Sequence, residues 1–388
     1  MTRFRPVAPR LVLFLLLSLM VSTAQATDER RLVRKAIEVA RSLRQSDNLY
    51  DQFAGAGILV EIGDKKSLQF LVDNLAHPDW SLMRSAIDTL LNVQHPAGLD
   101  VIYRYAATTD DGMFMKFLAE SCAIRPREDM GEFLARSLEL DDLWVKKHAL
   151  QALAMTPLDD KEARMRAIAE DEHEDSVSRA YAYYALVDTA ARDESIAKLI
   201  DIAMHWGAEA QEAAAVALGR VDTTATREAL ENLREARTYK VQVAAMVSEA
   251  GFGVREAVEA LADLIVNGKG LDPSVAAASV RRLPPDMAER LTASLIACCE
   301  LSSDVGTRLV EAWALIDADP AALLDWALAH ANADIRMQAI WLVGQRGERA
   351  YLDAIAPHLE DADSGARSMA AWAIVRMIGD AYEAGVET

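Results

Sequence analysis

Few residues of this sequence are placed where they could do chemistry together. Seven histidines are scattered along the chain, and none belongs to an H-E-x-x-H, a phosphate-binding glycine loop or a G-x-S-x-G motif. The densest cluster is EDEHED at 170–175, where Asp171, His173 and Asp175 could bind a metal ion through carboxylate and imidazole groups. No second cluster with matching spacing accompanies them, and a solvated turn ending in a capping aspartate explains the same residues. We therefore predict no catalytic residue, no metal site and no cofactor.

The cysteines do not form a disulfide framework in this interpretation. Cys122, Cys298 and Cys299 all lie in apolar helical sequence. Neighbouring residues on a helix point about 100° apart, so Cys298 and Cys299 are poorly placed to bond to each other. We interpret all three as small buried apolar residues.

The first 26 residues have the three-part pattern of a secretory signal peptide. MTRFRPVAPR carries three arginines, residues 11–22 are apolar, and Ala24-Gln25-Ala26 offers small side chains before a cleavage site at Thr27. The apolar run is too short for a membrane span of about 20 residues. We expect an exported protein of the bacterial periplasm. The alternative is a short buried N-terminal helix.

The charge of the chain restricts its partners. The formal net charge is −19, and removing the three N-terminal arginines makes it more negative. Such a chain repels nucleic-acid phosphates and anionic membrane surfaces. We therefore expect neither nucleic-acid binding nor membrane insertion after signal cleavage, whereas a basic partner is permitted.

The sequence after the leader repeats one helical unit. A nine-residue motif has a basic second place, a small fifth place in most copies, and apolar eighth and ninth places. Its clearest copies are VKKHALQAL (145–153), SRAYAYYAL (178–186), TRLVEAWAL (307–315), IRMQAIWLV (335–343) and ARSMAAWAI (366–374). Between the copies lie second helices with leucine stripes, such as Leu68, Leu71 and Leu75.

These copies predict an all-α solenoid. The units begin near residues 51, 80, 112, 143, 176, 208, 238, 273, 305, 335 and 365, and helix pairs of this period must stack to bury their apolar faces. We expect about eleven two-helix repeats over 51–388 in a right-handed superhelix, with a capping helix within 27–50. At roughly 9–10 Å between packed helices, the array would be an elongated arc on the order of 100 Å.

The motif resembles the HEAT repeat, in particular the short HEAT-like repeats of the bilin-lyase type. That pattern has an aspartate in the turn and then Val-Arg-x-x-Ala-Ala-x-Ala-Leu. The matching turn aspartates are Asp79, Asp111, Asp142, Asp175, Asp304, Asp334 and Asp363, where aspartate can cap a helix. The resemblance implies a ladder of Asp and basic side chains between units. Its members would be Asp142, Lys146, Asp175, Arg179, Asp304, Arg308, Asp334, Arg336, Asp363 and Arg367.

The motif also places aromatic side chains where water is expected. At roughly 100° per residue, its seventh place faces away from the buried fifth place, and that place is polar in Asp88, Ser121 and Gln151. The resemblance implies that this helix lines the concave surface. The predicted partner-binding patch consists of Trp313, Trp341, Trp372 and Tyr184 at the seventh place, with Leu309 and Met337 at the third place.

An exposed aromatic patch marks a binding surface, so we expect a non-enzymatic scaffold that holds another envelope protein or an extended peptide. Strong curvature or the C-terminal tail could instead cover the rings and make them core. The alternative function is binding of a glycan or a small apolar ligand on the tryptophans. A lyase-type enzyme is the alternative that the resemblance itself suggests.

Overall fold

The computed structural model describes residues 28–379, apart from 94, 125–126, 268–275, 278 and 299–301. The predicted signal peptide and Cys299 lie outside the described residues, as does the side chain of Cys298. Within them, every regular element is a helix, and none of these helices is both long enough and apolar enough to span a bilayer. The chain is an all-α repeat solenoid, as predicted.

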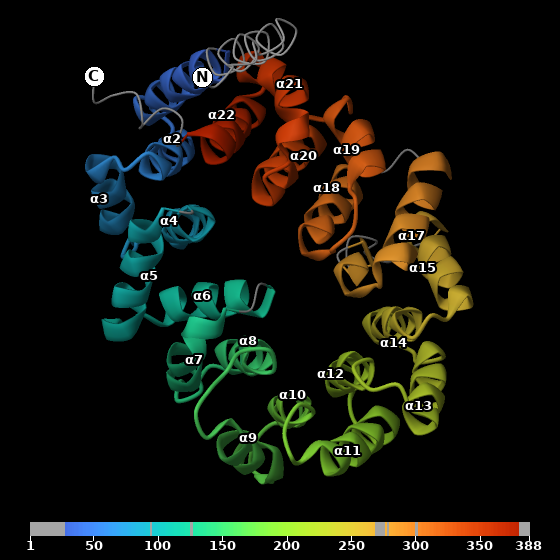
Figure 1. Ribbon diagram of the computed structural model, residues 1–388. Coiled ribbons are helices and arrows are strands. Elements are labelled where there is room, and N and C mark those ends of the chain that lie inside the picture. The colour runs from blue at the N-terminus through green and yellow to red at the C-terminus, as the bar shows by residue number, and fades with distance from the viewer. Residues whose placement is uncertain are drawn as a thin grey trace, which may run out of the picture.

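The helices form two concentric layers, with the motif helices on the inside (Figure 1). A helix at 28–44 precedes them. The inner helices are α2 (Leu49–Glu61), α4 (Trp80–Asn92), α6 (Gly112–Ile124), α8 (Leu143–Leu153), α10 (Ser176–Leu186), α12 (Ala208–Leu218), α14 (Tyr239–Gly251), α18 (Ser303–Ala312), α20 (Ala333–Arg346) and α22 (Ser364–Ile378). The outer helices are α3 (Lys65–Asp73), α5 (Pro96–Thr108), α7 (Gly131–Ser137), α9 (Lys161–Glu170), α11 (Arg192–His205), α13 (Thr224–Arg234), α15 (Arg255–Asn267), α17 (Pro285–Cys298), α19 (Ala321–Leu328) and α21 (Leu352–Ile355).

Short 3-10 turns complete several units, namely η1 (Glu128–Met130), η2 (Val280–Arg282), η3 (Trp313–Leu315), η4 (Arg349–Tyr351) and η5 (Ala356–Glu360). The inner helices begin within two residues of the predicted unit starts, apart from the unit predicted near 273, whose start lies outside the described residues. The repeat period is therefore a local property that the sequence displays directly.

Most of the predicted turn aspartates cap an inner helix. The carboxylates of Asp79, Asp111, Asp142, Asp175 and Asp363 accept backbone N–H groups of the helix that follows, which satisfies donors of the first turn. Asp304 and Asp334 do not cap. Their helices begin earlier, with Ser302 and Asn332 at the N-cap position, so both aspartates lie inside the first turn.

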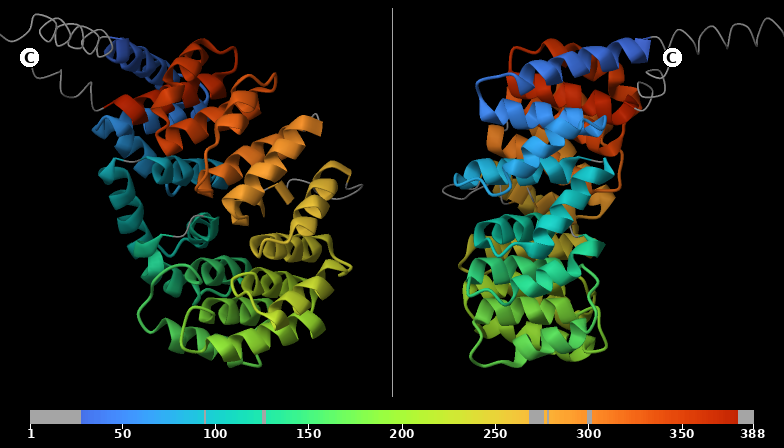
Figure 2. Two further views of the ribbon diagram at one scale, coloured as in Figure 1. Left: turned by 45° about the vertical axis from the view of Figure 1, so that its right-hand side comes forward. Right: turned by 90° about the vertical axis from the view of Figure 1, so that its left-hand side faces the viewer.

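The array closes into a ring, which differs from the open arc that we expected. Helix α2 packs against α22, so the first and last inner helices lie side by side (Figures 1 and 2). At the seam Gln345 donates to Asn92 across 3.1 Å, and Lys35 of the helix at 28–44 pairs with Glu360. The closure follows from curvature, which accumulates from unit to unit until the two ends of the array meet.

The hydrophobic core runs around the whole ring. One cluster extends from Phe53 of α2 to Ala245 of α14, and the second extends from Val243 of α14 to α22 and back to Ile58 of α2. The helix at 28–44 joins the second cluster through residues such as Ile37. Helices α2 and α14 thus contribute to both clusters, and the last unit has no exposed apolar end.

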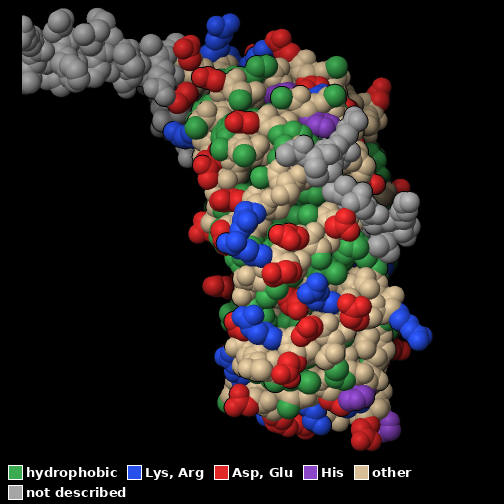
Figure 3. Space-filling view, turned by 90° about the vertical axis from the view of Figure 1, so that its right-hand side faces the viewer, with side chains coloured by type: hydrophobic (Ala, Val, Ile, Leu, Met, Phe, Trp, Pro, Cys, Tyr) green, Lys and Arg blue, Asp and Glu red, His purple; other side chains and the backbone are tan. Residues whose placement is uncertain are grey.

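One side of the outer wall shows no dominant charge. On the side of α15 and α17, acidic and basic side chains are interspersed with small hydrophobic areas (Figure 3). Mixed charge of this kind is an ordinary solubility feature. This side of the outer wall therefore offers no distinctive binding surface.

Candidate functional site in the lumen of the ring

The inner wall carries two adjoining cavities between the first and the last units. The seventh place of the repeat motif faces these cavities: Asp88 of α4, Ser121 of α6 and Trp341 of α20 all line the larger one. The repeat thus sets the direction of these side chains, and ring closure brings units far apart in the sequence to opposite sides of one space.

The larger cavity has a volume of about 740 Å³ and a charged lining. On one side Arg84 lies 3.4 Å from Glu120 and 3.7 Å from Asp88. On the other side Arg308 pairs with Glu311 at 2.8 Å. Both walls therefore present balanced ion pairs rather than one sign of charge. Such a lining suits a ligand with hydrogen-bonding and mixed charged groups.

The smaller cavity has a volume of about 510 Å³ and a largely apolar lining. It lies between α2 and α4 on one side and α20 and α22 on the other. Its lining includes Phe53, Met337, Trp341, Met369 and Trp372. Both cavities share a boundary made by Asp88, Asn92, Val93, Trp341 and Met369. One elongated ligand could therefore place an apolar part and a polar part side by side.

A buried arginine joins the cavities to the seam. The guanidinium of Arg376 donates to the backbone carbonyl of Asn92 at 2.7 Å and to Gln345 Oε1 at 2.8 Å. It also lies 3.9 Å from Glu61 and stacks over the ring of Trp372 at 4.8 Å. Because Arg376 lines the larger cavity, the shape of the site depends on closure of the ring.

The predicted exposure of the tryptophans is wrong. Trp313, Trp341 and Trp372 are only 2%, 8% and 7% exposed. The ring of Trp372 occupies the space that a side chain at residue 344 would need, since a Cβ on Gly344 would lie 2.5 Å from its Cζ3 atom. Ring closure then places α2 and α4 opposite α20 and α22, so only the edges of Trp341 and Trp372 reach the smaller cavity.

The six residues of the predicted patch do not form one surface. Trp341, Trp372 and the half-buried Met337 share the smaller cavity. Trp313 points to the outer layer, where its Nε1 donates to Thr292 of α17 at 3.0 Å. Helix α18 ends one residue earlier, so extrapolating its helical phase to Trp313 fails.

Two further members of the patch lie elsewhere. Leu309 is fully buried in the core. Tyr184 of α10 is 6% exposed and lies beneath the guanidinium of Arg220, 5.4 Å from the ring centroid. Neither residue lines the two cavities, so neither belongs to the lumen site described above.

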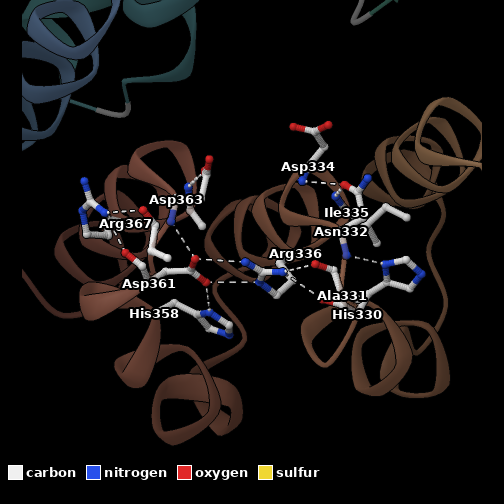
Figure 4. Close-up of polar contacts among 12 residues, drawn as sticks. His330, Ala331, Asn332, Asp334, Ile335, Arg336, His358, Asp361, Asp363 and Arg367 are labelled. Atoms are coloured by element: carbon white, nitrogen blue, oxygen red, sulfur yellow. Dashed lines mark hydrogen bonds and ion pairs between the residues drawn. The ribbon is translucent and has the colours of Figure 1, made fainter.

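The predicted ladder exists at Arg336, with a different acidic partner. Its Nε and Nη2 atoms donate to both carboxylate oxygens of Asp361 in the next unit, at 3.1 and 2.9 Å (Figure 4). The guanidinium beside Asp361 holds the pKa of that carboxyl well below its usual range, against the opposing effect of burial. Nη1 of Arg336 also donates to the carbonyls of His330 and Ala331, which end the preceding outer helix. Bidentate pairs of this kind are the stronger charge-assisted hydrogen bonds.

The other predicted ladder pairs do not form as expected. Lys146 pairs with Glu174 of the next turn at 3.2 Å and not with Asp142 or Asp175. Arg308 pairs with Glu311 of its own helix.

In the remaining units the arginine contacts backbone carbonyls of its own turn. Arg179 donates to the carbonyl of Ala169, and Arg367 donates to those of Asp361 and Ala362. The aspartates are occupied by helix capping, so the arginines satisfy the carbonyls at the ends of the outer helices instead.

The Asp334 carboxylate does reach the preceding unit, where it accepts from Ser303 at 3.1 Å. Asp304 has no role in an inter-unit ion pair among the described residues, since it lies inside the first turn of α18.

Comparison with known families gives the architecture a name. Residues 320–384, which contain α19 to α22, match the family described as HEAT repeats. These units match HEAT repeats. The rest of the ring continues the same two-helix architecture with the same inner-helix motif. The match does not extend to the narrower bilin-lyase type, which stays a prediction.

Solved structures match this chain only at low similarity. An engineered protein is 16% identical over 88% of this chain and 98% of its own, with a TM-score of 0.29. Human deoxyhypusine hydroxylase in complex with glycerol is 15% identical over 70% of this chain and 98% of its own, with a TM-score of 0.26. The Kap95:Nup1 complex is 12% identical over 91% of this chain and 56% of its own, with a TM-score of 0.35. No curated protein matches the chain.

The described residues present little reactive chemistry at the two cavities. Cys122 lines the larger cavity, and burial raises the pKa of its thiol to about 12, which keeps it protonated. Within the part of the chain that the structure describes, no three His, Cys, Asp or Glu side chains are grouped to hold a metal ion. In EDEHED, Asp171 accepts the backbone N–H of His173 and Asp175 caps α10.

Several lumen residues carried no signal that sequence reasoning used. Asn92, Gln345 and Arg376 lie two residues beyond the end of the nine-residue motif, and Met369 lies at its variable fourth place. Asp88 and Ser121 were noted only as polar members of the seventh place. The seventh place did carry a signal, because it faces the larger cavity in α4, α6 and α20.

Proposed function

We propose that this protein is a non-enzymatic scaffold that binds a segment of another protein in the lumen of its HEAT-repeat ring. The observation that carries the proposal is the adjacency of an apolar cavity and a charged cavity that share Trp341 and Asn92. A peptide offers apolar side chains and polar backbone groups a few ångströms apart, which is the combination that these two linings would accept.

The sequence pattern of residues 1–26 supports a place of action in the bacterial cell envelope, where the partner would be an exported protein. The acidic charge of the chain disfavours nucleic acid as the occupant. Since the cavities are enclosed by both ends of the array, we expect the partner to insert a flexible or terminal segment rather than a folded domain.

Site-specific photocrosslinking in cells would test this proposal. A photoreactive residue at Gln338, which lines the larger cavity, should yield a crosslinked partner that mass spectrometry identifies. The same residue at Lys198, exposed on outer helix α11, is the control position. Met337→Glu with Met369→Glu should abolish the Gln338 product by placing charge in the apolar cavity. Equal products from both positions, or no effect of the double variant, would refute binding in the lumen.

A second candidate is a small amphipathic molecule, including a glycan, in the same cavities. The volume of about 510 Å³ lies within the usual range of roughly 300–1,000 Å³ for small-molecule sites. Native mass spectrometry of the protein isolated from its host would reveal a bound small molecule directly. A discrete added mass that Met337→Glu removes would favour this candidate over the peptide.

A further inference from the structure

A second surface lies on one rim of the ring and meets the smaller lumen cavity at Tyr50. Among the described residues, eight large hydrophobic side chains are exposed, and six of them occupy the first or second position of four successive inner helices. They are Leu49 and Tyr50 of α2, Trp80 of α4, Met113 of α6, and Leu143 and Trp144 of α8, with exposed fractions between 36% and 57%. We call these six residues the rim stripe.

The rim stripe is continuous. The hydroxyl of Tyr50 lies 3.0 Å from Ser81 Oγ, which links α2 to the start of α4. The rings of Trp80 and Phe117 lie 6.1 Å apart, which links α4 to α6. Lys116 Nζ lies 5.3 Å from the ring of Trp144, which links α6 to α8. The four units therefore adjoin one another along this edge.

The later units do not continue the stripe. At the same two positions, α10, α18 and α22 carry Ser176, Ser303 and Ser364 followed by a buried valine, an aspartate and a glycine. Helices α12 and α20 begin with alanine followed by an acidic residue. Tyr239, at the first position of α14, is half-buried. At these two positions of the described inner helices, exposed aromatic side chains are thus confined to the first four units, and the repeat architecture does not require them.

The charge beside the stripe indicates what would cover it. Exposed aspartates lie just before or at the N-cap of these helices, at Asp47, Asp79, Asp110, Asp141 and Asp142. The lysines next to the stripe, Lys116 and Lys147, are half-buried over the rings of Trp144 and Tyr181.

A second copy of the ring or an anionic bilayer would bring like charges together on this edge, whereas a basic surface would be attracted. At roughly 9–10 Å between neighbouring inner helices, the stripe spans about 30 Å, the length of a helix of about 20 residues.

We propose that the rim stripe docks a basic, amphipathic segment of a partner protein, with apolar side chains on the six exposed residues and lysines or arginines on the aspartates. Exposed aromatic patches rimmed by charge are typical of protein interaction surfaces. The proposal does not depend on peptide binding in the lumen.

A binding experiment with designed peptides tests the proposal. The probes are three labelled 20-residue peptides: one of leucine and lysine on opposite helix faces, one of leucine and glutamate, and one of serine and lysine. Fluorescence anisotropy with the mature chain should show saturable binding of the leucine–lysine peptide alone. Comparable binding of the leucine–glutamate or the serine–lysine peptide would overturn the proposal, because apolar contact and positive charge are both required.

Variants place the binding on the rim. Trp80→Ser with Trp144→Ser should weaken binding at least tenfold, and Met155→Ser with Leu315→Ser, which removes exposed apolar side chains outside the stripe, should leave it unchanged. Equal effects of these two pairs would overturn the assignment.

The charge is tested without disturbing the capping aspartates. Asp47→Asn, Asp110→Asn and Asp141→Asn together should weaken binding and flatten its dependence on salt. Asp73→Asn, Asp325→Asn and Asp353→Asn on exposed outer positions are the matched control. A peptide that binds equally to both triple variants, or a ring that self-associates or binds vesicles containing phosphatidylglycerol instead, would overturn the proposal. The triple variants keep the test valid if the tryptophan variant fails to fold.

Discussion

Replacing Arg376 should open the ring at its seam. Its guanidinium makes two short hydrogen bonds to α4 and α20, at 2.7 and 2.8 Å, and lies 3.9 Å from Glu61. The side chains of Arg376 and Glu61 are only 8% and 5% exposed. Arg376→Met keeps the length of the side chain but leaves a buried carboxylate without its cation.

The expected cost follows from burial. Removing one partner of a buried ion pair costs about 3–5 kcal/mol, although Glu61 also accepts a hydrogen bond from the backbone N–H of His95, at 3.2 Å. With an unfolding entropy of roughly 2.1 cal/mol/K per residue over about 350 ordered residues, this corresponds to a decrease in Tm of about 4–7 °C. Differential scanning calorimetry would measure the shift.

A matched control separates burial from the number of ion pairs. Arg166 contacts three carboxylates, Glu162, Glu170 and Glu194, but all of these side chains are at least one-third exposed. Arg166→Met should therefore leave the Tm nearly unchanged, because solvent screens exposed ion pairs. Glu61→Gln should restore much of the stability of Arg376→Met, because a neutral amide needs no counter-charge.

Hydrogen exchange would locate the effect. In Arg376→Met, amides of residues 28–44, α2 and α22 should exchange faster, whereas those of α8 to α12 should be unchanged. Equal Tm shifts for Arg376→Met and Arg166→Met, or faster exchange spread evenly around the ring, would refute the reasoning that the seam is held by buried charge.

Four further predictions concern the ladder, the core and processing. Arg336→Ala should lower stability by about 1–3 kcal/mol, as urea unfolding would show. Because Arg336 depresses the pKa of Asp361 in the folded state, its stabilising effect is present above the unfolded pKa near 3.9 and is lost as the pH falls through the lower folded value. The variant should therefore lose less stability on acidification below pH 4 than the parent protein. Trp341→Ala should lower the free energy of unfolding by roughly 3–5 kcal/mol, as truncations of large core side chains do. Gly344→Ala should lower it by about 1–3 kcal/mol, because the added methyl group overpacks the contact with Trp372. Intact-mass analysis of the exported protein should give a mature chain that begins at Thr27.

Each of these has a contradicting result. An unchanged urea midpoint for Arg336→Ala, or the same acid sensitivity as the parent protein, would show that the contact with Asp361 contributes no stability. A cost below about 1 kcal/mol for Trp341→Ala would indicate an exposed ring after all. A stable Gly344→Ala variant would mean that α20 and α22 can separate at little cost. An exported species that retains residues 1–26 would contradict signal cleavage.

The fold was predictable because its determinants are local. Unit starts such as Trp80, Leu143 and Ser176 follow from the period of the motif and from the aspartates that cap the helices. Closure of the ring was not predictable in the same way. The hydrogen bond from Arg376 to Asn92 joins residues 284 positions apart, and the same local pattern would fit an open arc. Small differences in twist per unit, summed over the array, decide between the two.

In the candidate site too, local features were predictable and features that depend on ring closure were not. Helical phase placed Asp88 and Trp341 on the inner wall, and both line the larger cavity. Helical phase could not predict that Trp341 is buried, because its burial depends on the helices that ring closure places opposite it. It failed at Trp313 because α18 ends at Ala312 and a 3-10 turn follows.

The ladder depended on the residue types of the neighbouring turn. Arg336 finds Asp361 and Lys146 finds Glu174, whereas Arg179 donates to a backbone carbonyl. The position of the basic residue is fixed by the repeat, but its partner is an acid only where the next turn supplies one. A repeat consensus therefore predicts the donor more reliably than the acceptor.

Closure changes what the ends of a solenoid must do. Open arrays need terminal units with a polar outer face, because each end would otherwise expose apolar surface. Here α22 and α2 cover each other, and Ile37 of the preceding helix is buried in the same cluster as Trp372. The seam residue Arg376 also lines the larger cavity. A ligand that binds only the closed ring would therefore stabilise the seam in proportion to its concentration relative to its Kd, and a weakened seam would reduce its affinity by the fraction of rings that are open. A measurement of ligand binding in the lumen and a measurement of ring closure would therefore report on the same equilibrium.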